Sequence, residues 1–220
     1  MLNENVFENI DTEAKAYWLG WMLSDGFITE RTGNRQPTIG LKVKPSDIEI
    51  IQKFKDFLET SNTITIRDNY VSIRVHSQKM ANDLAQYTVT PRKSSKTRLP
   101  KLSNELMPHL IRGFLDGDGW ITKTYPKNYN GKHKYSIGFC SPSLIVNDIM
   151  YFLNTELDLP LLKTSRTTWK GNPFYQLEYQ GKKDCIKLFH YMYDTATIYL
   201  KRKYFKMYGD SEVNNYITKG

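Results

Sequence analysis

Two acidic residues, Asp25 and Asp118, occupy matching places in the chain, and a pair of carboxylates can bind a divalent cation. Each is followed by glycine and preceded by a largely apolar segment, residues 18–24 and 111–117. Their positions differ by 118 − 25 = 93 residues. If the fold brings these carboxylates together, their repulsion would raise one pKa unless a cation lies between them. Two hard oxygen ligands with room for water suit magnesium better than zinc.

Small residues in both segments indicate how the fold would bring the carboxylates together. Gly20 and Ser24 are four residues apart, as are Gly113 and Gly117, so each predicted helix has a stripe where another helix can approach closely. A glycine inside a helix costs roughly 1 kcal/mol against alanine, so it usually has a packing reason. If the stripes pack together, the helices end side by side. The aspartates would then lie at helix C-termini, where the macrodipole disfavours a carboxylate by roughly 0.3–1 kcal/mol.

The segments that follow each aspartate have the same order in both halves of the chain. Gly26 and Gly119 suit the left-handed turn that stops a helix. Alternating and helical periodicities then predict helix, hairpin, helix, hairpin, helix in each half. The predicted fold class is mixed α/β, of the α+β kind, with two pseudo-twofold-related αββαββα copies. We place the N-terminal copy at 1–90, a polar and basic linker at 91–102, and the C-terminal copy at 103–220. The predicted hairpin turns are Gly33-Asn34, Asp68-Asn69, Asn130-Gly131 and Lys170-Gly171-Asn172.

Composition narrows the possible partners. The 220 residues carry a net charge of +8 with a pI near 9.3, which favours a polyanionic partner, although a basic solvated surface is the alternative. Cys140 and Cys185 are the only cysteines, so neither a disulfide framework nor a structural zinc site is supported. The sequence has no signal-peptide pattern and no apolar run long enough to cross a membrane. We expect a soluble intracellular protein, in a bacterial or phage-infected cytoplasm or an organelle matrix.

The two segments resemble the paired signature of the LAGLIDADG homing endonucleases. Three residues of each copy fall on the most characteristic positions of that signature, and residues 116–119, Asp-Gly-Asp-Gly, are a close match. The first copy departs from it at Leu23, where the motif has its earlier acid. The matching residues are Gly20, Asp25, Gly26, Gly113, Asp118 and Gly119. The resemblance implies a site-specific double-strand DNA endonuclease that uses Mg²⁺, with two or three ions shared by the two motif aspartates.

The resemblance also implies active-site lysines. Basic pairs that follow the last helix of each copy give Lys93 and Lys203 as the candidates, with Lys96 and Lys201 as alternatives. A cation at such a position would stabilise the charged transition state. The other interpretation is that these residues only contact DNA phosphates.

The hairpins alternate aliphatic residues with polar and basic ones, so each sheet has one face for the helices and one polar face. A twisted basic ribbon fits the major groove, and two such sheets would form a DNA-binding saddle. The predicted DNA-binding residues of the first copy are Lys42, Lys44, Thr65, Arg67, Ser72 and Arg74. Their predicted counterparts in the second copy are, in order, Lys134, Ser136, Lys163, Ser165, Gln176 and Glu178. The alternative is that these are ordinary solvent-facing strand residues.

The predicted partner is double-stranded DNA with a long asymmetric target site, bound by a monomer. Two other functions stay open. One is an intron-encoded maturase that binds intron RNA on the same fold, and the other is a DNA-binding regulator that no longer cleaves. Retention of both Asp25 and Asp118 weighs against the regulator, because a protein that only binds DNA has no need for two carboxylates at unfavourable helix ends.

Overall fold

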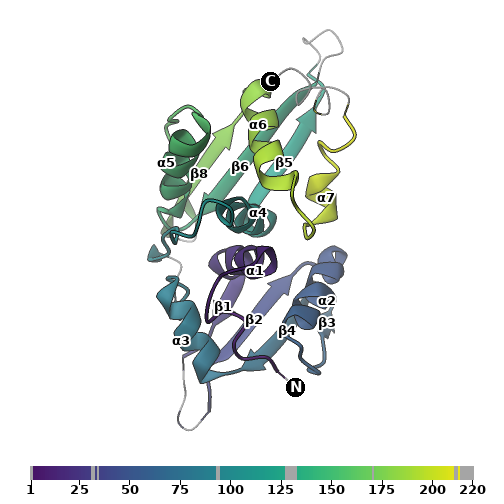
Figure 1. Cartoon of the computed structure of the whole chain (residues 1–220), viewed down its shortest axis with the longest axis vertical. Helices are drawn as coiled ribbons and strands as arrows, with labels where there is room; N and C mark the ends of the chain where they lie inside the picture. Colours follow the sequence, from purple (N-terminus) through teal and green to yellow (C-terminus); the bar gives the residue numbers. More distant parts are fainter. Residues whose placement is uncertain are drawn as a thin grey trace.

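The computed structural model describes residues 2–30, 33, 35–92, 95–126, 133–169, 171–210 and 213. The two halves lie end to end along the long axis, and helix α1 (Glu13–Leu23) packs against helix α4 (Met107–Asp118) between them (Figure 1). Both halves have the order αββαββα, so the predicted fold class is confirmed. In its described residues the second half also contains the short helix α7 (Lys201–Tyr204).

Each half builds one four-stranded antiparallel sheet. In the first half the sheet order is β1-β2-β4-β3, and in the second it is β5-β6-β8-β7. The other elements of the first half are β1 (Gly26–Ile28), β2 (Thr38–Val43), a 3-10 turn (Pro45–Asp47), α2 (Ile48–Phe57), β3 (Thr65–Arg67), β4 (Tyr70–His76) and α3 (Gln78–Gln86). Those of the second half are β5 (Gly119–Thr124), β6 (Lys134–Ser141), α5 (Ile145–Leu157), β7 (Ser165–Trp169), β8 (Asn172–Tyr179) and α6 (Lys182–Tyr193).

Alternation along the strands gives each sheet a buried face and a polar face. Strand pairing places Ile39 beside Val75 and Leu41 beside Ile73, and all four side chains are buried against the helices. Thr38, Lys42 and the other intervening residues lie on the opposite face. Ile66 departs from this pattern, because it is 60% exposed on the edge strand β3 although its partner Val71 on β4 is buried.

The contact between α1 and α4 is made by glycines, as the two stripes predict. A Cβ atom added to Gly20 would lie 2.3 Å from the carbonyl oxygen of Leu110. One added to Gly113 would lie 2.0 Å from the carbonyl oxygen of Tyr17. Neither carbonyl can move aside without displacing its helix. Only hydrogen atoms at these positions allow the two backbones to touch, so the glycines set the distance between the halves.

The two motif glycines have a different role from the predicted one. Gly119 is extended, with φ −129° and ψ −177°, and Gly26 is the first residue of β1, so neither makes a left-handed helix stop. Helix α4 passes directly into β5, and only two turn residues, Ser24 and Asp25, separate α1 from β1. A Cβ on Gly26 would lie 2.6 Å from the Cα of Met22, and one on Gly119 would lie 2.7 Å from the carbonyl oxygen of Gly138. Glycine is needed there for space.

The chain between the halves runs along the surface of the second half. Arg98 forms an ion pair with Asp148 of α5 at 2.7 Å, and Thr97 is buried. The predicted turns at Asn130-Gly131 and at Lys170 lie outside the described residues, as does Asn34. Among the helices that the structure describes, none is long and apolar enough to span a membrane.

We expect Gly113→Ala to destabilise the protein by about 1–3 kcal/mol, because the new methyl group overlaps the backbone of α1. Helix propensity alone predicts the opposite sign, a gain of up to about 1 kcal/mol. Urea unfolding of the wild type and the variant measures the difference. Gly181→Ala is the control, since its Cβ would meet only the movable carboxylate of Asp184. A Gly113→Ala protein as stable as the wild type would show that the helices do not pack this closely.

Candidate functional site

The packed helices bring the two motif aspartates to one place. Ser24 and Gly117 directly precede them, and a Cβ on Gly117 would lie 2.0 Å from the Oγ of Ser24. The charges of Asp25 and Asp118 both act on the thiol of Cys140 and on the ammonium of Lys203. Asp25 is exposed and Asp118 is half-buried. Both carboxylates therefore act on the same two side chains near the ends of the packed helices, and their role as a pair of metal ligands stays a prediction.

Cys140, which lies on β6, contacts the end of α4. Its Sγ donates a hydrogen bond to the carbonyl oxygen of Asp118 at 3.0 Å. Burial, together with the charge of Asp118, raises the pKa of this thiol to about 12. The thiol is therefore neutral at ordinary pH and serves as a donor that holds the Asp118 backbone.

Lys203 occupies the space beneath the end of α4. Lys203 is only 3% exposed. Its Nζ donates hydrogen bonds to the carbonyl oxygens of Leu115 (2.5 Å), Asp116 (2.8 Å) and Gly119 (2.6 Å). The ammonium thus caps the carbonyl end of the motif helix, where the macrodipole favours a cation. Burial lowers the pKa of Lys203 to about 8, against the opposing charge of Asp116.

The other lysine candidates lie elsewhere or outside the described residues. Lys93 lies outside them, so its position is not described. Lys96 is exposed. Lys201 forms an ion pair with Glu49 of α2 at 3.0 Å, which assigns it to the surface of the interface between the halves.

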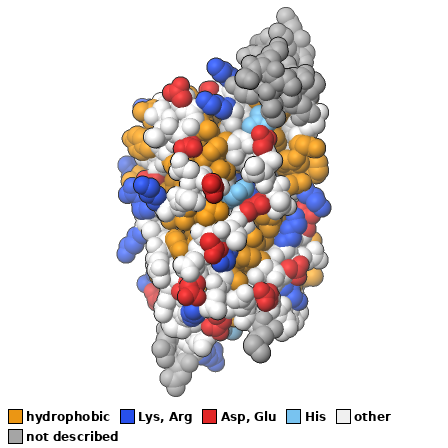
Figure 2. All heavy atoms as spheres, in the orientation of Figure 1, with side chains coloured by type: hydrophobic (Ala, Val, Ile, Leu, Met, Phe, Trp, Pro, Cys, Tyr) orange, Lys and Arg blue, Asp and Glu red, His pale blue; other side chains and the backbone are white. Residues whose placement is uncertain are grey.

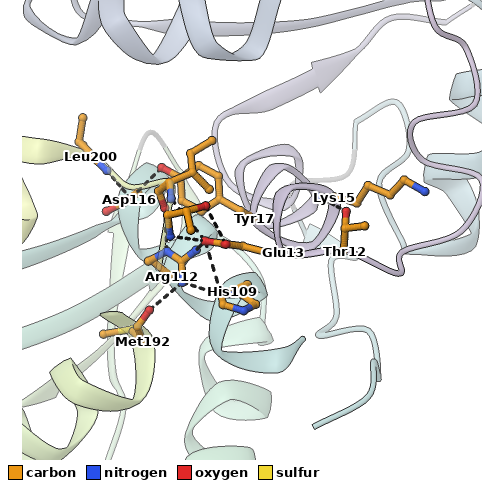
Figure 3. A network of polar contacts seen from close by, with 11 residues as sticks. Thr12, Glu13, Lys15, Tyr17, His109, Arg112, Asp116, Met192 and Leu200 are labelled. Atoms are coloured by element: carbon orange, nitrogen blue, oxygen red, sulfur yellow. Dashed lines mark hydrogen bonds and ion pairs between the residues drawn. The ribbon is translucent and has the colours of Figure 1, made fainter. Parts of the chain in front are cut away.

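Asp116, the earlier acid of the second motif, is completely buried between the halves. Its carboxylate accepts hydrogen bonds from the hydroxyls of Tyr17 (2.8 Å) and Tyr193 (3.2 Å) and from the backbone N–H of Leu200 (2.8 Å) (Figure 3). Burial raises the pKa of Asp116, although the charge of Lys203 opposes that effect. The carboxylate holds residue 200, three residues before Lys203, and so fixes the segment that carries the ammonium.

A second buried charge completes this network. Arg112 of α4 is fully buried and donates to Glu13 of α1 at 2.7 Å and to the backbone carbonyls of Met192 (2.7 Å) and Ile198 (2.9 Å) (Figure 3). Glu13 also accepts from the backbone N–H of Thr197 at 2.7 Å. Sequence reasoning missed this network. The available signal is Arg112, a basic residue in the largely apolar stretch of the motif helix between Leu110 and Leu115.

The polar sheet faces adjoin the aspartates, because β1 and β5 begin at the glycines that follow them. Most of the predicted DNA-binding residues lie there with exposed or half-buried side chains. Those exposed are Lys42, Lys44, Arg67, Arg74, Lys163, Ser165 and Glu178, and those half-buried are Thr65, Lys134 and Gln176. The other face of the molecule, where helices cover the sheets, carries Lys and Arg side chains mixed with Asp and Glu, so it has no continuous basic surface (Figure 2).

Two of the predicted contact residues need correction. Ser72 and Ser136 are on the polar faces, but they are only 0% and 8% exposed; Ser72 lies between Lys42 and Thr65 in the sheet, and the Ser136 hydroxyl is hydrogen-bonded to that of Thr122 at 2.8 Å. Neither is available for direct contact in this structure. The Lys42 ammonium, for example, lies 4.0 Å from the ring centre of Tyr70, on the strand that carries Ser72.

The predicted correspondence between the two sheets is also wrong in part. Gly40 and Gly138 occupy equivalent places, opposite the residue that follows each motif. Counting from these glycines, the counterpart of Lys42 is Cys140, and Lys134 and Ser136 correspond to Gln36 and Thr38. By the pairing of β3 and β7, Ser165 corresponds to Thr65, so Lys163 does not. The pairs Ser72 with Gln176 and Arg74 with Glu178 are correct.

The donor set at the helix ends fits a hard cation only in part. Asp25 and Asp118 provide carboxylate oxygens, which Mg²⁺ and Ca²⁺ prefer. No group of three or more His, Cys, Asp or Glu side chains gathers as a metal cage within the described part of the chain. Two carboxylates leave most of a six-oxygen shell to water or to the oxygens of a phosphate, so a cation would be held firmly only with a phosphate-bearing ligand present.

The buried ammonium predicts a pH dependence of stability. Because the pKa of Lys203 is about 8 in the folded protein and about 10.5 in the unfolded chain, the unfolded state binds more protons between these values. Wild-type stability should therefore rise relative to Lys203→Met, by about 2 kcal/mol from pH 7 to pH 9.5. Urea unfolding of both proteins across this range measures the difference. Lys183→Met, on the exposed surface of α6, should show no such slope, and a flat difference for Lys203→Met would mean that its ammonium is solvated.

Comparison with known proteins gives structural relatives only. No protein-family model and no curated protein sequence matches the chain. The LAGLIDADG meganuclease I-AabMI, solved bound to uncleaved DNA, superposes with a TM-score of 0.60 at 12% identity, covering 92% of this chain and 88% of that one. The LAGLIDADG homing endonuclease I-SmaMI bound to cleaved DNA gives 0.58 at 13% identity, with 91% and 88% covered. I-SmaMI bound to its uncleaved DNA target with calcium ions gives 0.54 at 13% identity, with 95% and 97% covered. The paired aspartate-glycine motifs thus lie within the fold that they predict, and this chain has the LAGLIDADG homing endonuclease fold.

Proposed function

We propose that this protein is a magnesium-dependent, site-specific endonuclease that cuts both strands of a long asymmetric DNA site, as homing enzymes do. The observation that carries the proposal is the placement of Asp25 and Asp118 at the shared end of α1 and α4, where the two polar sheet faces begin. The structural relatives I-AabMI and I-SmaMI, which were solved on DNA, support the same class of substrate.

The chemistry follows from the oxygen ligands and their surroundings. Magnesium, when bound with the DNA, would supply charge neutralisation at the scissile phosphate and a more acidic water. Asp25 and Asp118 would hold it from the protein side, and we propose that two or three ions are shared between them. The exposed side of Asp25 leaves room for the phosphate and for water.

In this proposal Lys203 is a positioning residue that does not itself contact the DNA. Its three donors are occupied by carbonyl oxygens, so its ammonium holds the end of α4 and places a positive charge under both aspartates. That charge reduces the repulsion between the carboxylates before any cation arrives. Lys93 stays our candidate for the corresponding role in the first half.

The two sheets would contact the major groove on either side of the cut. Exposed basic residues on their polar faces would position the DNA through its phosphates, and neighbouring side chains would read base edges. The two halves, joined in one chain through residues 91–102, differ at equivalent places, as Lys42 and Cys140 do. We therefore infer a monomer with an asymmetric target.

Asp25→Asn and Asp118→Asn should each abolish double-strand cleavage and leave DNA binding largely intact, since each removes a cation-binding charge and preserves the shape of the site. The assay maps new double-strand ends in genomic DNA incubated with magnesium, and gel shift in calcium measures binding. Asp56→Asn on the outer face of α2 is the matched control and should cleave normally. Full cleavage by Asp118→Asn would overturn the proposal. Tight binding of a structured intron RNA without DNA cleavage would favour the maturase instead.

Binding should weaken steeply with salt, because Lys and Arg on the sheets displace counterions from the DNA. Lys42→Ala and Lys44→Ala should each reduce the slope of log K against log[salt] by about 1. Fluorescence anisotropy with a labelled duplex measures these slopes. Lys55→Ala, on helix α2, should leave the slope unchanged, and equal effects of Lys42→Ala and Lys55→Ala would contradict binding through the sheet face.

A further inference from the structure

Three residues lie in line across the first sheet, and one of them, Phe27, holds the guanidinium of another, Arg74, in place. Phe27 follows the motif directly and pairs with Gly40 on β2, and Gly40 pairs with Arg74 on β4. A Cβ on Gly40 would lie 2.5 Å from the Cζ atom of Phe27, so only glycine allows the ring to lie across the middle strand. The guanidinium carbon of Arg74 is 5.7 Å from the centre of the ring, which is cation–π distance.

At the same three positions of the second sheet, Trp120 holds the carboxylate of Glu178 in place. Trp120 pairs with Gly138 on β6, and Gly138 pairs with Glu178 on β8. A Cβ on Gly138 would lie 2.1 Å from the Cζ2 atom of Trp120. The indole Nε1–H donates to Oε1 of Glu178 at 3.3 Å, and the side-chain amide of Gln180 donates to Oε2 at 2.9 Å.

The aromatic residue in each sheet matches the charge that it supports. A phenyl ring attracts a cation to its face and offers no N–H donor, whereas an indole N–H donates to a carboxylate. Although burial alone would raise the pKa of Glu178, the hydrogen bonds that it accepts, the one from Gln180 foremost, hold that pKa below its ordinary value. The two charged side chains are therefore held in defined directions on an exposed surface.

A positive and a negative side chain at equivalent places of the two sheets recognise different bases in the major groove. In the major groove a guanidinium donates two hydrogen bonds to O6 and N7 of guanine, and a carboxylate accepts from the N4 amino group of cytosine. Each group also rejects the other base, since guanidinium meets a donor on cytosine and carboxylate meets acceptors on guanine.

We propose that Arg74 and Glu178 read equivalent base pairs of the two half-sites with opposite preferences, guanine under Arg74 and cytosine under Glu178. Phe27 and Trp120 act as the supports that aim these groups. The inference rests on the proposed DNA-binding function, and it assigns part of the asymmetry of the target to one pair of residues.

Selection from a randomised DNA library, with the full chain in calcium buffer, tests this inference. The wild type should enrich a long site with guanine at one position and cytosine at the mirrored position of the other half. Arg74→Ala should lose the first preference and Glu178→Ala the second, each by about 5- to 150-fold in discrimination. Glu178→Arg should change its position from cytosine to guanine, and Phe27→Leu should weaken the guanine preference.

Matched controls remove the same charges from exposed helix positions. Lys183→Ala on α6 and Glu156→Ala on α5 should leave the enriched site unchanged. If the wild type enriches a site but Arg74→Ala and Glu178→Ala alter no single position, this inference is overturned and the proposed function stands. A uniform loss of affinity, with the sequence profile intact, would assign these residues to phosphate contact and also overturn it. A wild type that enriches no sequence would overturn both.

Discussion

Helices α1 and α4 meet backbone to backbone at Gly20 and Gly113, and this close approach fixes the place of every other element. Each helix is followed, directly or after two turn residues, by the first strand of its own sheet, which begins at the motif glycine. The close approach of the helices therefore also constrains how far apart the two sheets and the two aspartates can lie. Because the contact is made by backbone atoms, it has few rotamers to vary, and the geometry at the helix ends is set by covalent structure more than by side-chain packing.

That arrangement creates an electrostatic problem that other residues solve. Two helix C-termini and two carboxylates gather negative potential at one point, which disfavours folding in the absence of a cation. The buried ammonium of Lys203 offsets part of this negative potential, because it donates hydrogen bonds to carbonyl oxygens at the end of α4. Asp25 is exposed, so its carboxylate remains accessible to a cation from solvent. A site of this kind is poor in stability and well prepared for cations and for a ligand that brings them.

The order of elements, the helix contact and the pairing of the aspartates could be predicted, because glycine spacing and alternation are local patterns that repeat. The buried position of Lys203 could not, since no spacing in the sequence says which of several basic residues after α6 turns inward. Ser72 alternates correctly yet is covered by its neighbours, and alternation does not report the reach of longer side chains. Residue type alone pairs Lys42 with Lys134, which is wrong. The glycines at 40 and 138 mark the true register, because each must accommodate an aromatic ring.

The buried hydrogen-bond network around Asp116 limits which halves can be combined in one chain. Its carboxylate takes one hydrogen bond from Tyr17 of the first half and others from Tyr193 and Leu200 of the second, while the first half has Leu23 at the equivalent place. The halves are repeats in outline but are not interchangeable modules. A chimera that joins one half to the half of another protein of this fold, or a dimer built from two copies of one half, would leave a buried acid or hydroxyl unmatched. Recombination between genes for such proteins should therefore succeed only where both sides of this network are inherited together.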